Sequence, residues 1–360
     1  MVNILRRMGI RFRLSKISSG FYMTVKLSKK EFDSINEPIH FARGLPSACY
    51  TTKEWEEIDR ETSLATSWSC LGYCYDLSPG GYKTIEFLGI PLIIICDETG
   101  LHRVFHNVCR HRGHRLLDST GLLNGAIQCP YHGWTYRLDG MLKAAPHIGG
   151  FGTHELEDEY KSQHGLLEVR STTWLGLIFV NMSGDAVEFL DYIAPLRSRW
   201  ASFLGTEGFD QFLFPETNDL INLRVNANWK LVVDNYCESY HLPWVHPNLN
   251  SYSQTKDHYN IVINELGSGQ GTKKFSFVEE QAIKLPKFSG WPKKDIDLAE
   301  YIALYPNLLL GLHSDHFFVI VVHPIANDET LENILIYYPS KEVGSSEYEA
   351  ARRQVLAGWL

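Results

Sequence analysis

Two short segments that each hold one cysteine and one histidine constrain the fold of this chain most. The first pair is Cys109 and His111, the second is Cys129 and His132, and seventeen residues separate His111 from Cys129. Turn sequences such as Leu138-Asp-Gly140 occur around both pairs, so each pair is expected where a strand meets a turn. A small β-domain that brings the two turns together would gather two thiolates and two imidazoles in one metal site.

This set of ligands suits two kinds of metal centre. Zinc binds two cysteines and two histidines tetrahedrally, usually with like ligands paired along the chain. A [2Fe–2S] cluster binds them with two cysteines on one iron and two histidines on the other. Because each segment mixes the two residue types, the pattern favours the cluster, with Cys109, His111, Cys129 and His132 as its ligands.

The chain around these segments predicts an α+β protein of 360 residues in three parts. Residues 1–44 are a basic extension and lead-in. Residues 45–190 form an antiparallel β-rich domain, led by a helix from the capping box Thr51-x-x-Glu54. Residues 191–360 form an α+β domain. The expected strands include Tyr82–Leu88, Pro91–Cys96, Arg103–Asn107, Gly176–Asn181, Phe317–Val322 and Ile334–Tyr338.

A second group of metal-binding residue types lies in the second half of the chain. Asp234, Glu238 and His241 are spaced by four and three residues, which places them on one face of a helix. His246 follows five residues after His241, and Pro243 between them is expected to break the helix so that the two imidazoles can meet. A hydrogen-bonded polar helix face without a metal remains the alternative.

The Cys/His segments resemble the Rieske motif of ring-hydroxylating oxygenase α-subunits. The strings that carry the resemblance are Asn107–Gly113 and Cys129–Trp134, supported by Ala145-Pro146 and Gly176–Asn181. It covers roughly residues 45–360 and implies a Rieske [2Fe–2S] domain followed by a helix-grip-type catalytic domain with a mononuclear Fe(II).

The same resemblance implies roles for the second group. His241 and His246 would bind the Fe(II), and Glu238 would link the iron site to the Rieske histidine of a neighbouring subunit. Asp234 would orient the helix and the ligands.

In this family the third iron ligand is an aspartate on a long C-terminal helix. The last helix expected here begins at Ser346 and reaches Leu360 without such a carboxylate. Asp315 and Asp328 do not match the family's position. We therefore expect a chain truncated at its C-terminus, whose catalytic domain is incomplete. Such a chain should bind the Rieske cluster well and the mononuclear iron poorly.

The resemblance implies the terminal component of an oxygenase that hydroxylates a small organic substrate with O₂. Electrons would come from a separate NAD(P)H-dependent reductase or a ferredoxin, since the sequence has no Gly-x-Gly-x-x-Gly fingerprint. Family members assemble as homotrimers. The string Tyr240–His246 is similar to the branch of choline, carnitine and betaine oxygenases, so the substrate is expected to be an N-methylated quaternary amine or an aromatic compound.

The charge and the cysteine content limit which partners and which cellular compartment are expected. The net charge of −8 argues against nucleic acid, and no apolar run is long enough for a membrane span. Seven cysteines, an odd number, favour a reducing compartment such as the cytoplasm. Residues 1–30 carry eight basic residues and no acid, which makes mitochondrial targeting the alternative.

Two other functions fit parts of the sequence: a Rieske electron carrier without oxygenase activity, and a zinc-only structural protein.

Protein prepared without oxygen is expected to absorb visible light and to release acid-labile sulfide, because a [2Fe–2S] cluster contains both iron and sulfide. Metal analysis distinguishes the oxygenase from the electron carrier: about three irons per chain indicate an oxygenase, and about two indicate a carrier. Zinc without sulfide would contradict the cluster.

Overall fold

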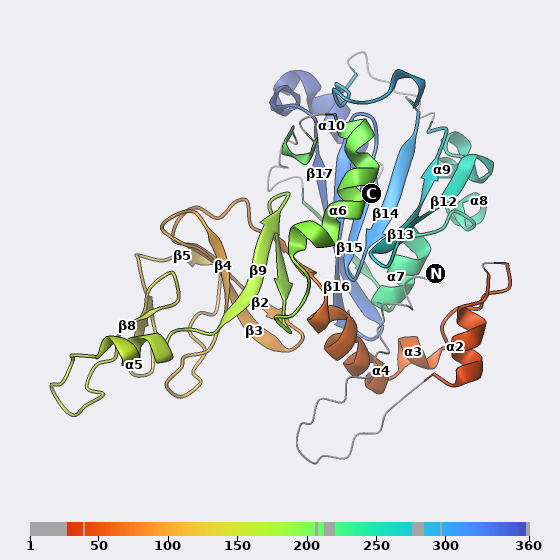
Figure 1. The fold of residues 1–360 in the computed structure, drawn as a ribbon. Coiled ribbons are helices and arrows are strands. Elements are labelled where there is room, and N and C mark those ends of the chain that lie inside the picture. Colours follow the sequence, from red (N-terminus) through yellow and green to blue (C-terminus); the bar gives the residue numbers. More distant parts are fainter. Residues whose placement is uncertain are drawn as a thin grey trace. The chain divides into compact units, whose positions relative to one another are not determined.

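The computed structural model describes residues 27–38, 40–205, 208–211, 220–275, 284–295 and 297–357. The chain divides into two compact units, one of residues 68–186 and one that combines the segments on either side of it (Figure 1). The helices between residues 48 and 64 group with the second unit, whereas the sequence attaches them to the first domain. Residues 1–26, which carry most of the expected basic extension, lie outside the described residues.

The unit of residues 68–186 is built almost entirely from antiparallel strands. Its seven-stranded sheet has the order β1-β10-β9-β4-β3-β2-β5, and a separate three-stranded sheet has the order β6-β7-β8. The elements are β1 Ser69–Tyr73, β2 Gly81–Phe87, β3 Ile90–Cys96, β4 His102–His106, β5 Gly121–Leu122, β6 Ile127–Gln128, β7 Thr135–Tyr136, β8 Leu142–Ala144, α5 Asp158–Gln163, β9 Glu168–Trp174 and β10 Leu177–Asn181. The predicted antiparallel β-rich domain is therefore confirmed.

The core of this unit lies between the two sheets. Ile93, Ile95 and Phe105 from the large sheet pack in one buried cluster with Tyr136 of the small sheet and Trp134, which directly precedes β7. The ring of Phe105 lies so close to the turn before β8 that a Cβ at position 140 would meet it at 2.4 Å, and φ there is +85°. Only glycine fits both conditions. This packing fixes the small sheet, and with it the second Cys/His segment, on the large one.

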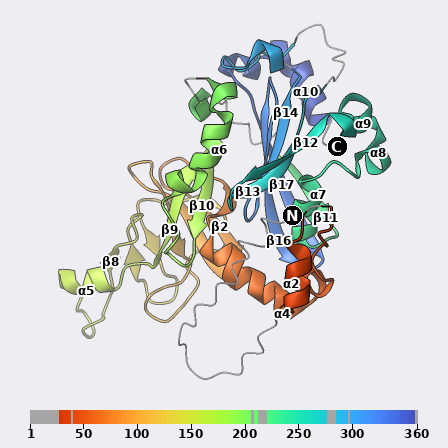
Figure 2. The same ribbon diagram turned by 45° about the vertical axis from the view of Figure 1, so that its right-hand side comes forward.

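The second unit is a seven-stranded antiparallel sheet with helices on both faces. The strand order is β11-β17-β16-β15-β14-β13-β12. Figure 2 shows α6 on one side of this sheet and α7 on the other. The strands are β11 Ile221–Val225, β12 His258–Ile263, β13 Gly267–Thr272, β14 Ala299–Leu304, β15 Leu308–Leu312, β16 Phe317–Ala326 and β17 Glu329–Tyr337. The α-helices are α2 Lys29–Ile35, α3 Ala48–Thr51, α4 Lys53–Ile58, α6 Phe189–Leu204, α7 Trp229–Tyr236, α8 Leu242–Val245, α9 Pro247–Tyr252 and α10 Glu349–Ala357.

Helix α7 packs on the sheet because its apolar residues recur on one face. Trp229 and Val233, four residues apart, are buried against Ile320 and Ile334 of the central strands. Asn228 caps the helix by accepting a hydrogen bond from the Lys230 N–H at 3.0 Å. The α+β class expected from the sequence is confirmed by this arrangement.

Two predicted helix starts differ from the observed ones. Helix α4 is capped by Thr52, which accepts from the Trp55 N–H, and Thr51 instead ends α3. At the other end of the chain, a 3₁₀ turn of Ser346–Tyr348 precedes α10, which begins at Glu349. A side-chain cap and a helix start can shift by a residue when a neighbouring turn competes for the same backbone groups.

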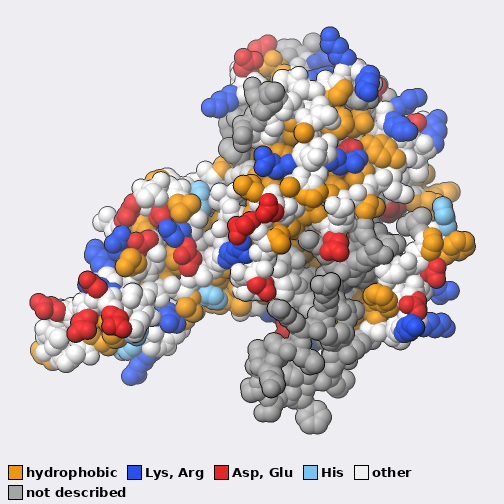
Figure 3. Space-filling model, viewed as in Figure 1, with side chains coloured by type: hydrophobic (Ala, Val, Ile, Leu, Met, Phe, Trp, Pro, Cys, Tyr) orange, Lys and Arg blue, Asp and Glu red, His pale blue; other side chains and the backbone are white. Residues whose placement is uncertain are grey.

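No helix in the described ranges is long and apolar enough to cross a membrane. Charged side chains of both signs are spread over the face seen in Figure 3.

A buried ion pair joins the N-terminal helices to α7. Lys230 contacts Asp59 in the π-helical turn that follows α4, and both side chains are about 97% buried, with 3% and 2% exposed. Burial raises the pKa of Asp59 and the Lys230 cation opposes that shift. Asn228 also donates to the carbonyl of Tyr50 at 3.1 Å. These contacts hold residues 48–59 against the helix that leads to the second candidate site.

Replacing Asp59 tests how much this pair contributes. Asp59→Ala leaves the Lys230 ammonium buried without a counter-charge, so the free energy of unfolding should fall by about 3–5 kcal/mol. Glu349→Ala is the control, because Glu349 pairs with Arg353 on the surface at 2.5 Å and such pairs contribute less than about 1 kcal/mol. Urea unfolding near neutral pH measures both. Equal effects of the two variants would contradict a structural role for the buried pair.

Candidate metal sites

The two Cys/His segments fold into loops with the same backbone hydrogen bonds. In the first, the Cys109 N–H donates to the carbonyl of His114 and the Gly113 N–H donates to the carbonyl of Cys109, at 2.8 and 3.0 Å. In the second, the corresponding donors are Cys129 and Gly133, at 2.7 and 3.0 Å. Each loop needs a glycine in the left-handed region, and φ is 71° at position 113 and 70° at position 133.

The matched loops bring their four predicted metal-binding side chains together. The rings of His111 and His132 lie 4.6 Å apart, and burial together with the adjacent Cys109 thiol raises the pKa of Cys129. Both cysteines are almost fully buried, at 3% and 2% exposed, whereas His132 is exposed. The indole of Trp134 stacks on the His111 ring at 4.9 Å and holds it in place.

The chemistry of this group fits a bound metal centre. Nδ1 of His111 is buried and has no hydrogen-bond partner, which is costly unless another group binds it. Two thiols and two imidazoles at the tips of two loops are the kinds of ligand that a Rieske-type [2Fe–2S] cluster takes. The Tyr136 hydroxyl, absent from the sequence prediction, lies 3.2 Å from Sγ of Cys109 and accepts a hydrogen bond from the Arg110 N–H.

The second predicted site is not a single helix face, which corrects the expectation from spacing. Helix α7 ends at Tyr236, so Glu238 and His241 lie beyond it. Pro243 does not break a helix either, because it lies in the first turn of the short helix α8, where a missing N–H is harmless. His241 and His246 flank α8 at its two ends.

Helix α8 nevertheless brings the two histidines together. Their ring centroids lie 5.4 Å apart at an interplanar angle of 76°. Glu238 contacts Nδ1 of His241 through Oε1, and its Oε2 accepts from the backbone N–H groups of Tyr240 and His241. With Nδ1 bound to the carboxylate, Nε2 of His241 is the ring nitrogen left for a metal.

Asp234 has a different environment from the other predicted residues. Its carboxylate accepts a hydrogen bond from the Tyr50 hydroxyl at 3.1 Å. Burial raises the pKa of Asp234, and the bond from Tyr50 opposes the shift. Asp234 thus ties α7 to the N-terminal helices, a contact that no local spacing in the sequence indicates.

Gln270 on β13 is a further residue that the sequence analysis missed. Its Nε2 donates to the carbonyl of Glu238 at 2.7 Å and to that of Tyr236 at 3.2 Å, so it holds the chain where α7 ends. The signal for it was present in the sequence, since Gln270 is the one large side chain in the strand Gly267–Thr272.

No third ligand joins His241 and His246 within the described ranges. There, no three His, Cys, Asp or Glu side chains gather closely enough to hold one metal ion. Asp315 instead accepts from Nδ1 of His316 at 2.7 Å, and Asp328 lies in the turn between β16 and β17.

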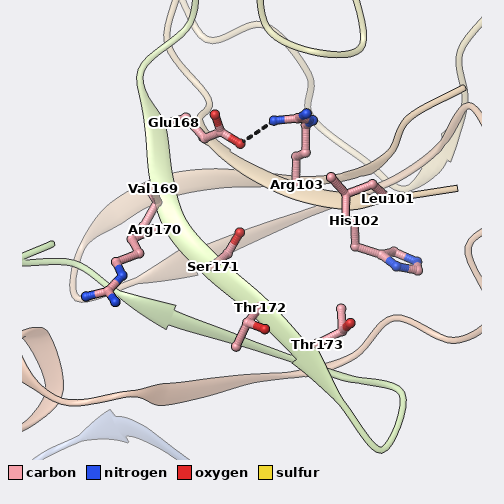
Figure 4. A pocket seen from close by; sticks show the side chains of 9 residues that line it. All are labelled: Leu101, His102, Arg103, Glu168, Val169, Arg170, Ser171, Thr172 and Thr173. Carbon is pink, nitrogen blue, oxygen red and sulfur yellow. Dashed lines mark hydrogen bonds and ion pairs between the residues drawn. The ribbon is translucent and has the colours of Figure 1, made fainter. Parts of the chain in front are cut away.

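One pocket lies in the unit of residues 68–186, where β4 and β9 diverge (Figure 4). An ion pair of 2.8 Å between Arg103 and Glu168 crosses it. None of the four Cys/His side chains lines this pocket, so we assign it no part in the metal chemistry.

Comparison with protein families identifies both units. The Rieske [2Fe-2S] domain matches residues 67–155, and the ring hydroxylating alpha subunit (catalytic domain) matches residues 217–359. The chain is a Rieske oxygenase α-subunit. These two domains imply a [2Fe–2S] cluster and a mononuclear iron, and an oxygenase subunit implies a separate reductase.

Curated relatives of this Rieske oxygenase include oxygenase subunits of two kinds. The carnitine monooxygenase oxygenase subunit of Escherichia coli K12 is 28% identical over 310 residues, which are 83% of this chain and 76% of the relative. The glycine betaine monooxygenase oxygenase subunit of Chromohalobacter salexigens is 32% identical over 212 residues, which are 57% of this chain and 43% of the relative.

Solved structures share the fold. A quaternary ammonium Rieske monooxygenase described in a study of carnitine oxidation by gut microbiota is 26% identical with a TM-score of 0.69, over 88% of this chain and 80% of that one. Naphthalene 1,2-dioxygenase from Rhodococcus sp. is 19% identical with a TM-score of 0.64 over the same shares. Together, the two family matches and the curated relatives show that the chain is the terminal component of a Rieske non-haem iron oxygenase.

The contact between Tyr136 and Cys109 predicts an effect on the cluster. Tyr136→Phe should lower the reduction potential, because a hydroxyl that donates to the Cys109 sulfur stabilises the extra negative charge of the reduced cluster. Tyr131→Phe is the control, since its exposed ring lies on the second loop. Protein-film voltammetry measures both. An unchanged potential in Tyr136→Phe would show that the hydroxyl does not donate to the cluster.

Proposed function

We propose that this oxygenase hydroxylates an N-methylated quaternary amine. The observation that carries the proposal is that aromatic residues bracket the segment of Glu238, His241 and His246, and that their rings are connected through Tyr301 and Phe275. The ring of Tyr236 precedes the site, and Tyr252 follows it at the end of α9. Aromatic faces attract a quaternary ammonium group through cation–π contacts. Relatives named for carnitine and glycine betaine support the same substrate class.

We assign the metal ligands as the sequence predicted them. Cys109, His111, Cys129 and His132 would hold the [2Fe–2S] cluster, and the unpaired Nδ1 of His111 supports this. His241 and His246 would hold the mononuclear iron. When bound, the two centres supply single electrons and the reductive activation of O₂.

Glu238 has a defined task in this scheme. Its carboxylate holds the proton at Nδ1 of His241, which fixes the tautomer and keeps Nε2 available as a ligand. Because its side chain is 41% exposed, the same carboxylate can also reach a group outside the chain. Asp234 acts at a distance, by keeping α7 attached to Tyr50.

A head-to-tail homotrimer would bring the two centres of neighbouring chains together. Large apolar side chains next to Glu238 are exposed: Tyr240 and Trp244 by more than 80% and Val245 by 62%. Tyr131 and His132 are exposed at the cluster. Exposed apolar groups beside both sites are typical of surfaces that another subunit covers.

The remaining partners follow from the same scheme. An NAD(P)H-dependent reductase or a ferredoxin would supply electrons, and O₂ is the second substrate. None of the seven cysteines, all of which lie in the described ranges, forms a disulfide, which supports a reducing compartment such as the cytoplasm.

Turnover by the reconstituted holoenzyme tests the substrate class. With a reductase and NADH, the amount of O₂ consumed should equal the amount of substrate lost when the substrate is glycine betaine, carnitine or choline. Naphthalene and 2-aminobenzenesulfonate represent the second candidate class, aromatic compounds, for which a relative named as a dioxygenase gives some support. Matched turnover of an aromatic compound alone would overturn the proposal.

Glu238→Gln tests the bridging role. The amide keeps the shape of the side chain but loses the charge, so turnover should fall by roughly 100-fold while both metal centres stay loaded. Glu347→Gln, at an exposed position in the turn before α10, is the matched control. Iron and sulfide analysis together with turnover rates checks this. Turnover at the wild-type rate in fully loaded Glu238→Gln would rule out the role.

A further inference from the structure

A chain of hydrogen bonds joins the two ends of the segment that carries the proposed iron ligands. Ser253, which directly follows α9, bonds Nε2 of His258 through its hydroxyl at 3.0 Å. Nδ1 of His258 bonds Oε1 of Gln270 at 2.8 Å. Gln270 in turn donates to the carbonyls of Tyr236 and Glu238. The segment between Tyr236 and Ser253 is thus closed by side chains as well as by the backbone.

The two middle members of this chain of bonds come from neighbouring strands. His258 begins β12, the edge strand of the sheet beside α8 and α9 (Figure 1), and Gln270 lies on β13. Because His258 pairs with Thr272 in the antiparallel register, His258 and Gln270 are diagonal neighbours on one face of the sheet. The sheet itself therefore sets the distance between the two ends of the segment.

The direction of each hydrogen bond follows from the groups that make it. Carbonyl oxygens only accept, so the Gln270 atom that meets two of them is the amide nitrogen. The amide oxygen then faces His258 and requires a hydrogen at Nδ1. Nδ1 carries that hydrogen in either charge state of the ring, and the Ser253 hydroxyl can donate to Nε2 or accept from it. The connection therefore does not depend on the protonation of His258.

Burial makes these hydrogen bonds costly to break. Ser253 and Gln270 are 1% and 8% exposed, and His258 is half-buried. Water does not readily replace a partner at such positions, so a lost bond leaves a buried polar group unpaired. The same loss at an exposed position would have little effect. The bonds can thus hold the backbone to which Gln270 is attached.

The backbone of Glu238 matters because its side chain organises the proposed iron site. Its carboxylate contacts Nδ1 of His241 and accepts from the backbone N–H groups of Tyr240 and His241. A shift of the Glu238 carbonyl would move these contacts together. It would also move the ring of His241 relative to that of His246, which lies 5.4 Å away between centroids.

We propose that His258 is a positioning residue of the iron site. By fixing the Gln270 amide it holds the backbone at Glu238, so that His241 and His246 lie in place before the iron binds. This inference rests on the proposed function, which makes those two histidines the iron ligands. Replacing a group that orients metal ligands from a distance typically changes metal affinity by roughly 10- to 100-fold.

Metal binding by the full chain with its cluster tests this proposal. Fe(II) is titrated without oxygen in a calorimeter, and the binding that His241→Ala removes defines this site. His258→Phe keeps a ring but loses both hydrogen bonds, so the Kd should rise about 10- to 100-fold. His258→Asn places an amide N–H near the position of Nδ1 and should recover part of the affinity. His40→Phe, the same substitution at an exposed position of the same unit, should leave the Kd unchanged.

A double variant tests whether His258 acts through Gln270. Gln270→Met keeps the length of the side chain but removes the amide, so it should weaken Fe(II) binding at least as much as His258→Phe. The double variant should then bind Fe(II) no more weakly than Gln270→Met alone, because the two residues act as one unit. Losses that multiply in the double variant would overturn the connection, since they would show two independent contributions.

Amide hydrogen exchange separates this proposal from the proposed function. The N–H groups of Tyr240 and His241 bond the Glu238 carboxylate, so without added iron they should exchange about 2- to 10-fold faster in His258→Phe. If they do, but the wild type shows no His241-dependent Fe(II) binding, the positioning role stands and the ligand assignment fails.

Two results would overturn the positioning role itself. One is unchanged exchange at these amides, or an unchanged Kd where the wild type binds Fe(II). The other is equally faster exchange across the whole sheet together with a lower unfolding midpoint, which would make His258 a packing residue.

Discussion

The end of helix α7 at Tyr236 determines the geometry of the catalytic unit. The Tyr236 hydroxyl donates to the carbonyl of Leu310 on β15 at 2.9 Å, and Gln270 on β13 donates to the carbonyls of Tyr236 and Glu238. The helix is thus attached to two strands where its own hydrogen bonds stop. If the helix continued, Glu238 and His241 would lie on one face of it. The early end lets the chain fold back, so that α8 can place His241 beside His246.

Local patterns in the sequence predicted what depends on near neighbours in the chain. The strand runs, the paired Cys/His segments and the class of each domain follow from alternation, turn residues and motif spacing, and the comparisons bear out the family and the fold. The sequence did not predict where α7 ends, because the bonds from Gln270 come from a strand more than thirty residues away. Spacing alone favoured a continuous helix, and Pro243 fits the start of a helix as well as its end.

The contacts of Tyr50, and the ring contacts that connect Tyr236 with Tyr252, were equally inaccessible to sequence analysis. Tyr50 is separated from Asp234 by 184 positions. The rings that connect Tyr236 with Tyr252 come from α7, α9, β14 and the segments after β13 and β15. An aromatic residue alone has no pattern that distinguishes a core position from a binding position. Only the tertiary arrangement shows that Tyr236 and Tyr252 are joined through Tyr301, His313 and Phe275.

The unequal burial of the four Cys/His side chains has a consequence for the direction of electron transfer. Both thiols are sealed in the core of the β-unit, and the ring of His132 reaches the surface. A cluster held by these residues would have one insulated side and one open side. Electrons tunnel most readily where the path is shortest, so charge would leave through the imidazoles. Although the two loops are alike in their backbone hydrogen bonds, electrons would then leave the cluster in one direction only, toward the exposed histidine side.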